Sequence, residues 1–427
     1  MNRHSRWCTI FMSLLAGFVL TLGSLFPQNA QALPAFSRQT GNECNTCHFQ
    51  HFPKLSAFGR IFKANGLSLT AQDNIEGKDL SIPQTLNATF FIHSVATKES
   101  NKRATLELPG EAAILVGGRM AEGVGGVVEW GGPLLSTKIS YTRPIGDSRV
   151  GATAFTTDGI GPAYGFEVMN TGVVRNHSPF AQSANPTLGN NSNLELAGAA
   201  TGIALFVFNN DWFVNGTVYA PDSNVAGYTG MDVGGDMSTY LRAAYTPIIK
   251  GWETGIGAGI IRGRTKATIT DSGDADIFGG GGTGGYIGTI NTRAMFVDGQ
   301  VQGQVGGKDL GVYFIYASGD DPTTAAQLAA NEVNRFGGVS GGDKPSGWGI
   351  DAEYSMLPDR LHLLASLGHH DNGSAGQSAK TSAGVGLYWK LAQNISLQPM
   401  VERYGGDQGQ VSGKDVNVTS VTLEADF

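Results

Sequence analysis

The C-terminal stretch Val416–Phe427, VNVTSVTLEADF, alternates between apolar and polar side chains. From Val421 to the terminal Phe427, every second residue is apolar and the residues between are polar. Residues 86–93 and 361–370 follow the same rule. Because successive side chains of an extended chain point to opposite faces, this period of two predicts strands whose two faces meet different surroundings.

The same pattern recurs along most of the chain after about residue 81. We expect about sixteen strands of roughly ten residues, at 83–97, 111–120, 123–131, 134–145, 148–158, 197–208, 211–221, 237–248, 251–264, 290–302, 308–318, 346–356, 359–370, 379–391, 395–405 and 416–427. Some connections are tight turns, whereas those at 159–196, 265–289 and 319–345 are long and rich in Gly, Asn and Asp. Short turns on one rim and long loops on the other are typical of an outer-membrane barrel.

A soluble β-sandwich is the main alternative fold, and three features disfavour it. The predicted strands are too numerous and too evenly spaced for one sandwich. The chain ends on an aromatic residue, as outer-membrane barrels tend to do. Aromatic residues also lie near predicted strand ends, where interfacial girdles occur: Tyr141, Tyr219, Trp252, Tyr354 and Tyr404. We therefore predict an all-β, transmembrane antiparallel barrel of about sixteen strands, closed because lipid leaves no partner for an open edge.

The first 32 residues predict a secretory signal peptide. Arg3 and Arg6 precede an apolar run from Ile10 to Phe26, and the small-x-small sequence at 30–32 marks the cleavage site. The whole chain has 427 residues and a net charge of −7. Without the two leader arginines it carries 27 basic and 36 acidic residues, a net charge of −9. We expect an outer-membrane location and no nucleic-acid partner.

The stretch Glu43–Pro53 contains C-x-x-C-H, the attachment signature of a c-type haem. Cys44 and Cys47 are spaced to bond the two vinyl groups of one porphyrin, and His48 is the predicted proximal ligand of the haem iron. A zinc site would need a second ligand pair, and Cys8 leaves with the signal peptide. A redox dithiol would need a βαβ context that this chain lacks. We therefore expect one covalently attached haem c.

Residues 33–80 form a predicted monohaem plug segment, and residues 81–427 form the predicted barrel. A short helix is expected from Lys54 to Asn65, with Leu55, Phe58 and Phe62 on one face packed on the porphyrin and with Arg60 and Lys63 on the opposite side. A segment of about 30 residues is too small to bury a haem by itself, so it must lean on another part of the chain. A sixteen-stranded barrel has a bore wide enough to hold it.

Residues 34–66 resemble the fused outer-membrane cytochrome–porins of iron-oxidising bacteria. The resemblance is carried by PAFSRQTG at 34–41, the haem motif with HFQHFP at 48–53, and FGR-x-FK-x-x-G at 58–66. It implies an oxidoreductase that oxidises extracellular Fe(II) and passes the electron to a periplasmic carrier such as a soluble cytochrome c. Ser37 stands where the family pattern has a small Ala, and Leu67 stands where it has an aromatic residue.

The charges are unevenly distributed along the chain. Residues 33–66 carry Arg38, Lys54, Arg60 and Lys63 against Glu43 alone, a net charge of +3, so the remainder of the mature chain is at −12. A basic plug suits haem propionates and an acidic wall, and Arg60 is a candidate propionate contact. Asp-rich sequences at 271–276 and 319–321 are candidate iron stations, although solvated turns have the same composition.

The residue on the distal side of the haem stays open in the sequence. His51 is a candidate, but three residues from His48 it is better placed for packing or for a propionate contact. His93, His362 and His370 are predicted to face the lumen. The methionines at 120, 169, 231, 237, 295, 356 and 400 are further candidates. Two other functions also remain open: an electron conduit for another donor such as a sulfur compound, and a porin with a structural haem.

Overall fold

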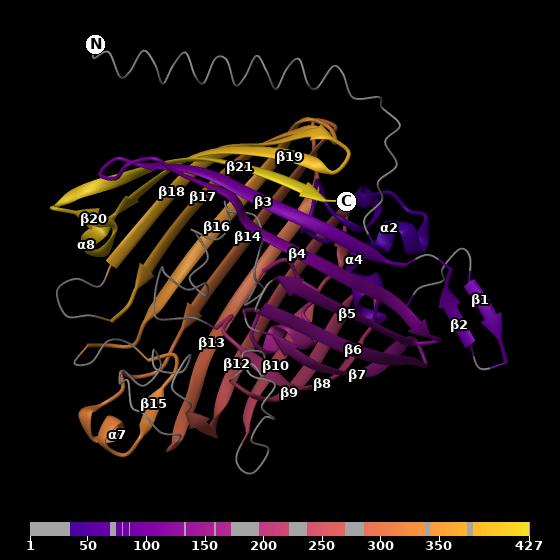
Figure 1. The fold of residues 1–427 in the computed structure, drawn as a ribbon, viewed down its shortest axis with the longest axis horizontal. Coiled ribbons are helices and arrows are strands. Elements are labelled where there is room, and N and C mark those ends of the chain that lie inside the picture. Colours follow the sequence, from indigo (N-terminus) through magenta and orange to yellow (C-terminus); the bar gives the residue numbers. More distant parts are fainter. Residues whose placement is uncertain are drawn as a thin grey trace.

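The computed structural model describes residues 35–68, 74–78, 80–84, 86–131, 134–157, 159–171, 196–221, 237–269, 286–337, 342–373 and 379–426. The predicted signal peptide and the terminal Phe427 lie outside these residues. Most described residues belong to strands that form one closed barrel (Figure 1). Among these residues no helix is long and apolar enough to cross a membrane.

Sixteen antiparallel strands make up the described wall of the barrel. They are β3 (Ala88–Glu99), β4 (Thr105–Ala121), β5 (Val124–Gly131), β6 (Leu134–Ile145), β7 (Ser148–Thr157), β8 (Ala200–Phe208), β9 (Trp212–Ala220), β10 (Ser238–Tyr245), β12 (Trp252–Ile269), β13 (Tyr286–Val305), β14 (Lys308–Ser318), β16 (Ser346–Leu357), β17 (Leu361–Asp371), β18 (Ala379–Ala392), β19 (Ile395–Gly405) and β21 (Lys414–Asp426). Each predicted strand corresponds to one of them, which confirms the predicted fold class. The first and last strands, β3 and β21, pair with each other and close the ring.

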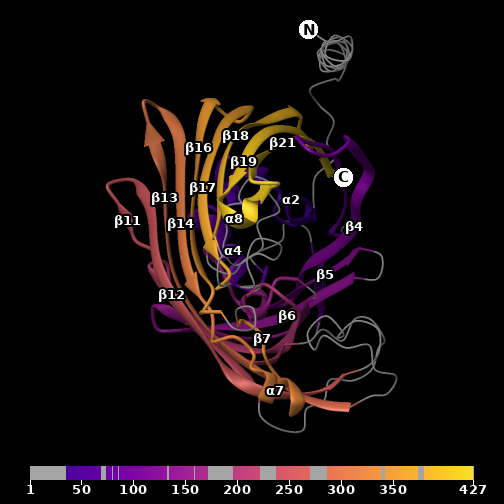
Figure 2. The ribbon, with the colours of Figure 1, turned by 90° about the vertical axis from the view of Figure 1, so that its left-hand side faces the viewer.

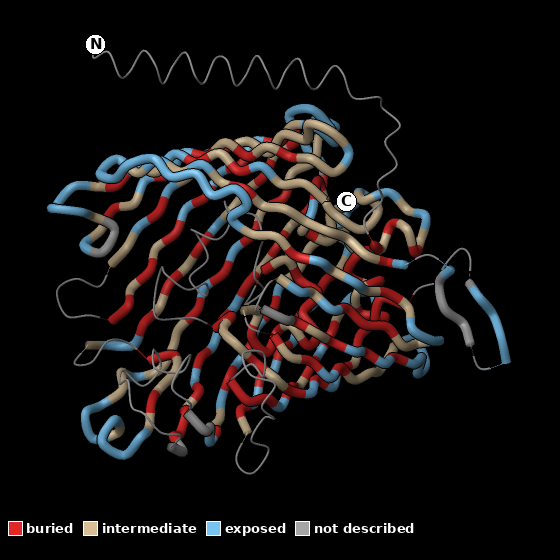
Figure 3. Tube along the Cα trace, viewed as in Figure 1, coloured by how far each residue is buried: buried red, intermediate tan, exposed pale blue. Residues whose placement is uncertain are grey.

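The wall has the two-sided character that the alternation predicts (Figure 3). Along β17, His362, Ser366 and His370 are buried toward the lumen, while Leu363 and Leu367 are exposed on the outside. Outward apolar side chains face lipid, and the closed ring leaves no unpaired edge in the hydrocarbon. The protein is therefore a barrel of the bacterial outer membrane.

The two rims differ in the length of their connections. Two-residue turns at 122–123, 146–147 and 306–307 join strands on one rim, whereas residues 158–199, 221–237 and 270–285 join strands on the other. In outer-membrane barrels the short turns are periplasmic, so this rim faces the periplasm. The predicted loop at 319–345 contains further structure, namely α7 (Ala325–Ala329) and β15 (Glu332–Asn334). Two smaller pieces, β11 (Ile248–Ile249) and β20 (Gln410–Val411) with α8 (Gly406–Gly409), extend the rims.

The segment that carries the haem motif lies inside the barrel at its periplasmic mouth. It contains α2 (Ala35–Thr40), α3 (Cys44–Cys47) and α4 (Ala57–Ala64), and Figure 2 shows α2 and α4 within the ring of strands. In Figure 1 α2 lies at the opposite end of the barrel from α8. A separate hairpin of β1 (Asn74–Gly77) and β2 (Leu80–Pro83) follows, so the predicted boundary at residue 80 falls inside it. We call residues 35–68 the plug.

The helix expected over 54–65 is shorter, and its faces differ from the prediction. It begins after Ser56, whose side chain accepts a hydrogen bond from the Gly59 amide, and it ends before Asn65. Phe62 does not share an exposed face with Phe58. It is buried against Phe36 and the wall, and the Phe36 and Phe62 ring centroids are 5.5 Å apart. Of the residues predicted to share one face, Phe62 therefore packs on the barrel wall, whereas Phe58 is exposed.

Candidate functional site

The two cysteines of the plug occupy a single helical turn. Cys44 and Cys47 begin and end α3, both are half-buried, and neither forms a disulfide. The backbone amide of His48 donates to the Cys44 carbonyl oxygen at 2.9 Å, which places His48 directly after the turn. Burial and the neighbouring Cys44 raise the pKa of the Cys47 thiol. The turn therefore offers two thiols and one imidazole on a continuous stretch of chain.

Helix α4 packs directly against this turn. A Cβ atom on Gly59 would lie 1.9 Å from the Cys47 carbonyl oxygen, so only glycine allows the two segments to approach so closely. The Ser56 amide donates to the same carbonyl at 2.9 Å, and the Ser56 hydroxyl donates to the Thr46 carbonyl at 2.8 Å. The family-like sequence FGR at 58–60 thus has a packing role in holding the cysteine turn.

The environment of His48 is compatible with metal coordination. Its Nδ1 atom is buried and has no hydrogen-bond partner among the residues that the structure describes. Burial lowers the pKa of His48 to about 4, against the opposing effect of the nearby backbone of Lys54 and Pro53, so the imidazole is neutral at pH 7. Metal coordination requires this neutral form. The donor set of two thiols and one neutral imidazole fits a covalently attached haem.

Two aromatic side chains beside the turn are exposed. Phe52 is 45% exposed, and its ring stands edge-on to His48 with centroids 5.3 Å apart. Phe58 is 41% exposed on α4. Large apolar side chains left uncovered beside the cysteines suit the face of a porphyrin, which is itself apolar and broad. Cys44, Cys47 and His48 would hold a haem here.

A buried ionic cluster fastens the plug to β16. Lys54 is buried, its Nζ lies 3.0 Å from Asp351 Oδ2, and it also bonds Glu353. The ammonium lies 4.1 Å from the centroid of the Tyr313 ring. Burial alone would lower the pKa of Lys54, but the two carboxylates outweigh it and raise the pKa well above its ordinary value. His51 joins the cluster, with Nε2 at 2.9 Å from Glu353 Oε2.

Sequence reasoning missed this cluster. It assigned the plug's positive charge to haem propionates and to an acidic wall in general, without naming wall residues. The signal lay in β16, where Asp351 and Glu353 occupy alternate positions and so share the inward face. His51 also stacks on Tyr388 at 3.7 Å between ring centroids. Its packing role is therefore on the barrel wall, while the identity of the distal ligand stays a prediction.

Arg60 reaches the wall at a second point. Its Nη1 lies 3.3 Å from Glu253 Oε2 and 3.2 Å from Gln302 Oε1, and the side chain is buried. The Ala57 amide donates to the same Glu253 oxygen at 2.6 Å. Arg60 points away from the exposed Phe58, and it is buried against β12 and β13. A propionate contact by Arg60 stays a prediction.

The other distal candidates are scattered. His93 lies on β3, in register with Glu424 and with Glu111. His362 faces the lumen next to His51, with ring centroids 5.5 Å apart. Met120, Met295 and Met356 are exposed on the barrel, whereas Met169 and Met400 are buried, Met237 is half-buried, and Met231 lies outside the described residues.

A second inward segment, residues 159–171, crosses the lumen beside the plug. It contains the 3₁₀ turn η1 (Pro162–Gly165). Glu167 accepts from Arg242 Nε at 2.9 Å, and Arg242 also forms two hydrogen bonds to Asp298, at 2.5 and 2.8 Å. All three side chains are buried. Burial raises the pKa of Glu167, Arg242 opposes the rise, and Asp298 adds to it.

This segment also binds the plug directly. The Leu55 amide donates to Asn170 Oδ1 at 2.6 Å, and Asn170 Nδ2 donates to the Leu55 carbonyl at 3.0 Å. The long connection expected over 159–196 therefore begins with a part that folds into the bore. Plug and inward segment share one apolar cluster with the wall, and the inward segment also bonds Lys138 of β6 and Arg242 of β10.

The Asp-rich sequences at 271–276 and 319–321 provide little support for an iron site. Residues 271–276 lie outside the described residues. Asp320 lies 4.0 Å from Arg293 and Asp321 lies 3.5 Å from Lys344, so each already has a cationic partner. In the described part of the chain, no group of three or more His, Cys, Asp or Glu side chains is placed to hold a metal ion.

Comparison with known proteins finds similar barrels. No family model and no curated protein matches the chain. Among solved structures, OprB of Pseudomonas putida is 10% identical, with 80% of this chain and 93% of that chain covered and a TM-score of 0.47. OmpT of Vibrio cholerae is 10% identical, with 83% and 100% covered and a TM-score of 0.46. Functional inference therefore rests on the geometry of the plug and of the wall around it.

Proposed function

We propose that the protein is an outer-membrane c-type cytochrome–porin that oxidises extracellular Fe(II) and passes the electron to a periplasmic carrier. One observation carries the proposal: the turn with Cys44, Cys47 and His48 is fastened at the periplasmic mouth of an outer-membrane barrel. A bound haem would supply a one-electron acceptor at this mouth. Each Fe²⁺ would lose one electron and become Fe³⁺.

The chain's own residues would position and insulate this group. The ionic cluster around Lys54 and the pair of Arg60 with Glu253 fix the plug against the wall. Helix α4 holds the cysteine turn through Ser56 and Gly59. Ferric iron is insoluble near neutral pH, so a cell benefits from leaving the oxidised metal outside and taking in only the electron. A barrel that reaches both sides of the outer membrane suits that task.

Two alternatives share the same architecture. A conduit for another donor, such as a sulfur compound, needs the same haem and the same barrel. A porin with a structural haem needs an open path for solutes beside the plug. The inward segment 159–171 and its bonds to Leu55 favour a closed bore over an open one.

The decisive experiment feeds Fe²⁺ to the purified, oxidised protein without oxygen and follows the absorbance of reduced haem. Prompt reduction by Fe²⁺ supports the proposal. Reduction by sulfide with no response to Fe²⁺ favours the other donor, and rapid solute entry in a liposome swelling assay favours the porin. If the denatured polypeptide retains no covalent haem, the proposal and both alternatives are refuted.

The proximal ligand has a matched control on the same protein. His48→Ala is expected to abolish the low-spin haem spectrum and Fe²⁺-dependent reduction while the barrel still inserts. His369 lies on the outward face of β17, whereas His362 and His370 face the lumen. His369→Ala is therefore expected to leave the spectrum unchanged. Unaltered iron oxidation in the His48 variant would show that the ligand is wrongly assigned. His93→Ala shifts the spectrum only if His93 is the distal ligand.

A further inference from the structure

Two arginines face each other on the outside of the barrel. Arg262 of β12 and Arg293 of β13 are direct partners in the antiparallel register, and both are exposed. Arg264 and Lys266 follow on the same outward face of β12. Like charges directly opposite each other on neighbouring strands destabilise a sheet. An anion bound between the two guanidinium groups would offset this repulsion.

The acidic neighbours do not neutralise this cluster. Glu332 binds Arg264, and Asp320 is 4.0 Å from Arg293. Within the described residues, Arg262 has no carboxylate within the 4.0 Å of an ion pair. Arg262 and Arg293 border a hollow of about 460 Å³, large enough for a phosphate and part of a sugar. Asp320 and Asp321 also line it, and Asp321 is paired with Lys344. The local charge is positive in a chain whose net charge is −7.

The arginine pair lies where the apolar band of the wall ends. Toward the periplasmic rim, the next outward pair in the register is Ile260 with Met295, followed by Ala258 with Val297. Ile260, Met295 and Val297 are exposed to lipid. Toward the long-loop rim the next outward positions of β12 are Arg264 and Lys266, both polar. The arginines are therefore at the level of lipid headgroups in the outer leaflet.

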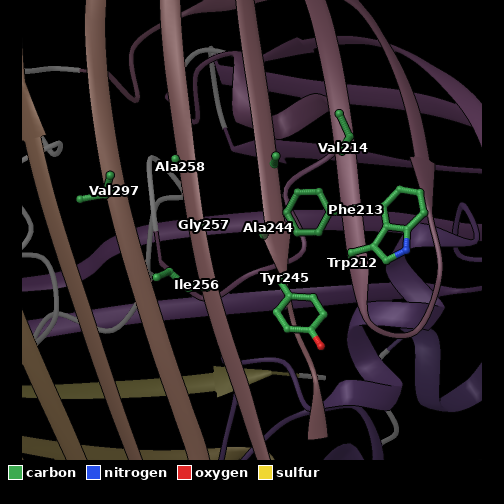
Figure 4. A pocket seen from close by; sticks show the side chains of 10 residues that line it. Trp212, Phe213, Val214, Ala244, Tyr245, Ile256, Gly257, Ala258 and Val297 are labelled. Atoms are coloured by element: carbon green, nitrogen blue, oxygen red, sulfur yellow. The ribbon is translucent and has the colours of Figure 1, made fainter.

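An apolar hollow of about 510 Å³ lies on the same side of the barrel, between Val297 of β13 and the periplasmic ends of β9 and β10 (Figure 4). Its exposed lining side chains are apolar or aromatic, among them Val214, Tyr245, Ile256 and Val297. Val297 is four residues from Arg293, or about 13 Å along an extended strand. A cationic pair above an apolar hollow matches one molecule with a phosphate head and acyl chains.

We propose that this face of β12 and β13 binds a phosphorylated glycolipid of the outer leaflet, such as the lipid A part of lipopolysaccharide. Arg262 and Arg293 hold a phosphate between them, as arginine forks bind phosphate oxygens. Acyl chains lie in the apolar hollow below. The site lies on the outer face of the wall, whereas the plug lies inside it, so this proposal does not depend on the function proposed for the plug.

The test measures binding of purified lipid A to the detergent-purified, full-length protein by native mass spectrometry. Replacing both arginines (Arg262→Ser with Arg293→Ser) is expected to weaken binding about 25-fold, since each arginine near an anionic headgroup contributes on the order of a fivefold factor. Arg262→Lys with Arg293→Lys retains the charge and recovers part of the affinity. Arg403→Ser, an exposed arginine on β19, is the matched control and leaves binding unchanged.

The lipid is distinguished from a free anion by two further probes. Dephosphorylated lipid A is expected to bind as weakly as lipid A binds to the double serine variant. Inorganic phosphate at millimolar concentration is expected to displace little lipid A. The proposal is overturned if the double serine variant binds as wild type, if Arg403→Ser weakens binding equally, or if inorganic phosphate displaces the lipid. A heat-modifiable gel shift confirms that each variant is a folded barrel.

Discussion

Replacing Lys54 by methionine tests whether the ionic cluster fastens the plug. The ammonium is buried between Asp351 and Glu353, and both carboxylates would remain without it. Methionine keeps the apolar stem and removes only the charge. Removal of one partner from a buried ion pair costs about 3–5 kcal/mol. Release of the plug should therefore become roughly 150- to 5,000-fold more frequent.

The assay is limited proteolysis of the detergent-solubilised barrel, with cleavage within residues 35–68 located by mass spectrometry. Lys63→Met is the matched control. Lys63 lies on α4 in the same plug, burial lowers its pKa against a weaker opposing effect of Glu167, and no carboxylate among the described residues lies within 4.0 Å of it. Its loss should not increase cleavage. Adding Glu353→Gln to Lys54→Met removes one stranded carboxylate and should restore part of the protection. Equal cleavage of wild type and Lys54→Met would refute the reasoning.

Three further predictions concern the turn and the inward segment. Gly59→Ala places a Cβ 1.9 Å from the Cys47 carbonyl, so α4 must shift by an overpacking cost of about 1–3 kcal/mol, and covalent haem measured on denaturing gels should fall. Arg242→Met leaves two buried carboxylates, and single-channel conductance should rise as residues 159–171 detach, with no rise counting against a sealing role. A raised pKa means that docked Glu167 holds a proton that the undocked form loses, so protection of the segment from hydrogen exchange, corrected for intrinsic rates, should fall as pH rises above 4.5. Glu167→Gln should remove this pH dependence, and a slope that persists would assign it to another group.

The wall of the barrel was predictable because its signal is local. Each strand buries alternate residues in one face, so a run such as 361–370 reveals both its conformation and its orientation. Strand ends were less certain, since β12 and β13 continue to Ile269 and from Tyr286, beyond the expected ends. The cysteine turn was equally local, because its chemistry depends on spacing within five residues.

The contacts that place the plug were not predictable in the same way. Lys54 meets Glu353 across 299 residues of chain, and Glu167 meets Arg242 across 75. No period or motif marks such a pair, because each depends on how the closed ring brings distant strands together. The face of α4 was misread for the same reason: Phe62 packs on a wall residue, Val127, that the helix sequence does not reveal.

The pairing of β3 with β21 has a consequence for biogenesis. This junction joins the first and last strands, from Asp426 opposite Phe91 to Val418 opposite Glu99, and it encircles a segment that precedes both in the chain. The proposed haem would require attachment enzymes to reach Cys44 and Cys47, which are half-buried within the closed ring of strands. Attachment of the proposed haem should therefore precede delivery to the barrel-assembly machinery, and a barrel that closes earlier should enclose a plug without haem.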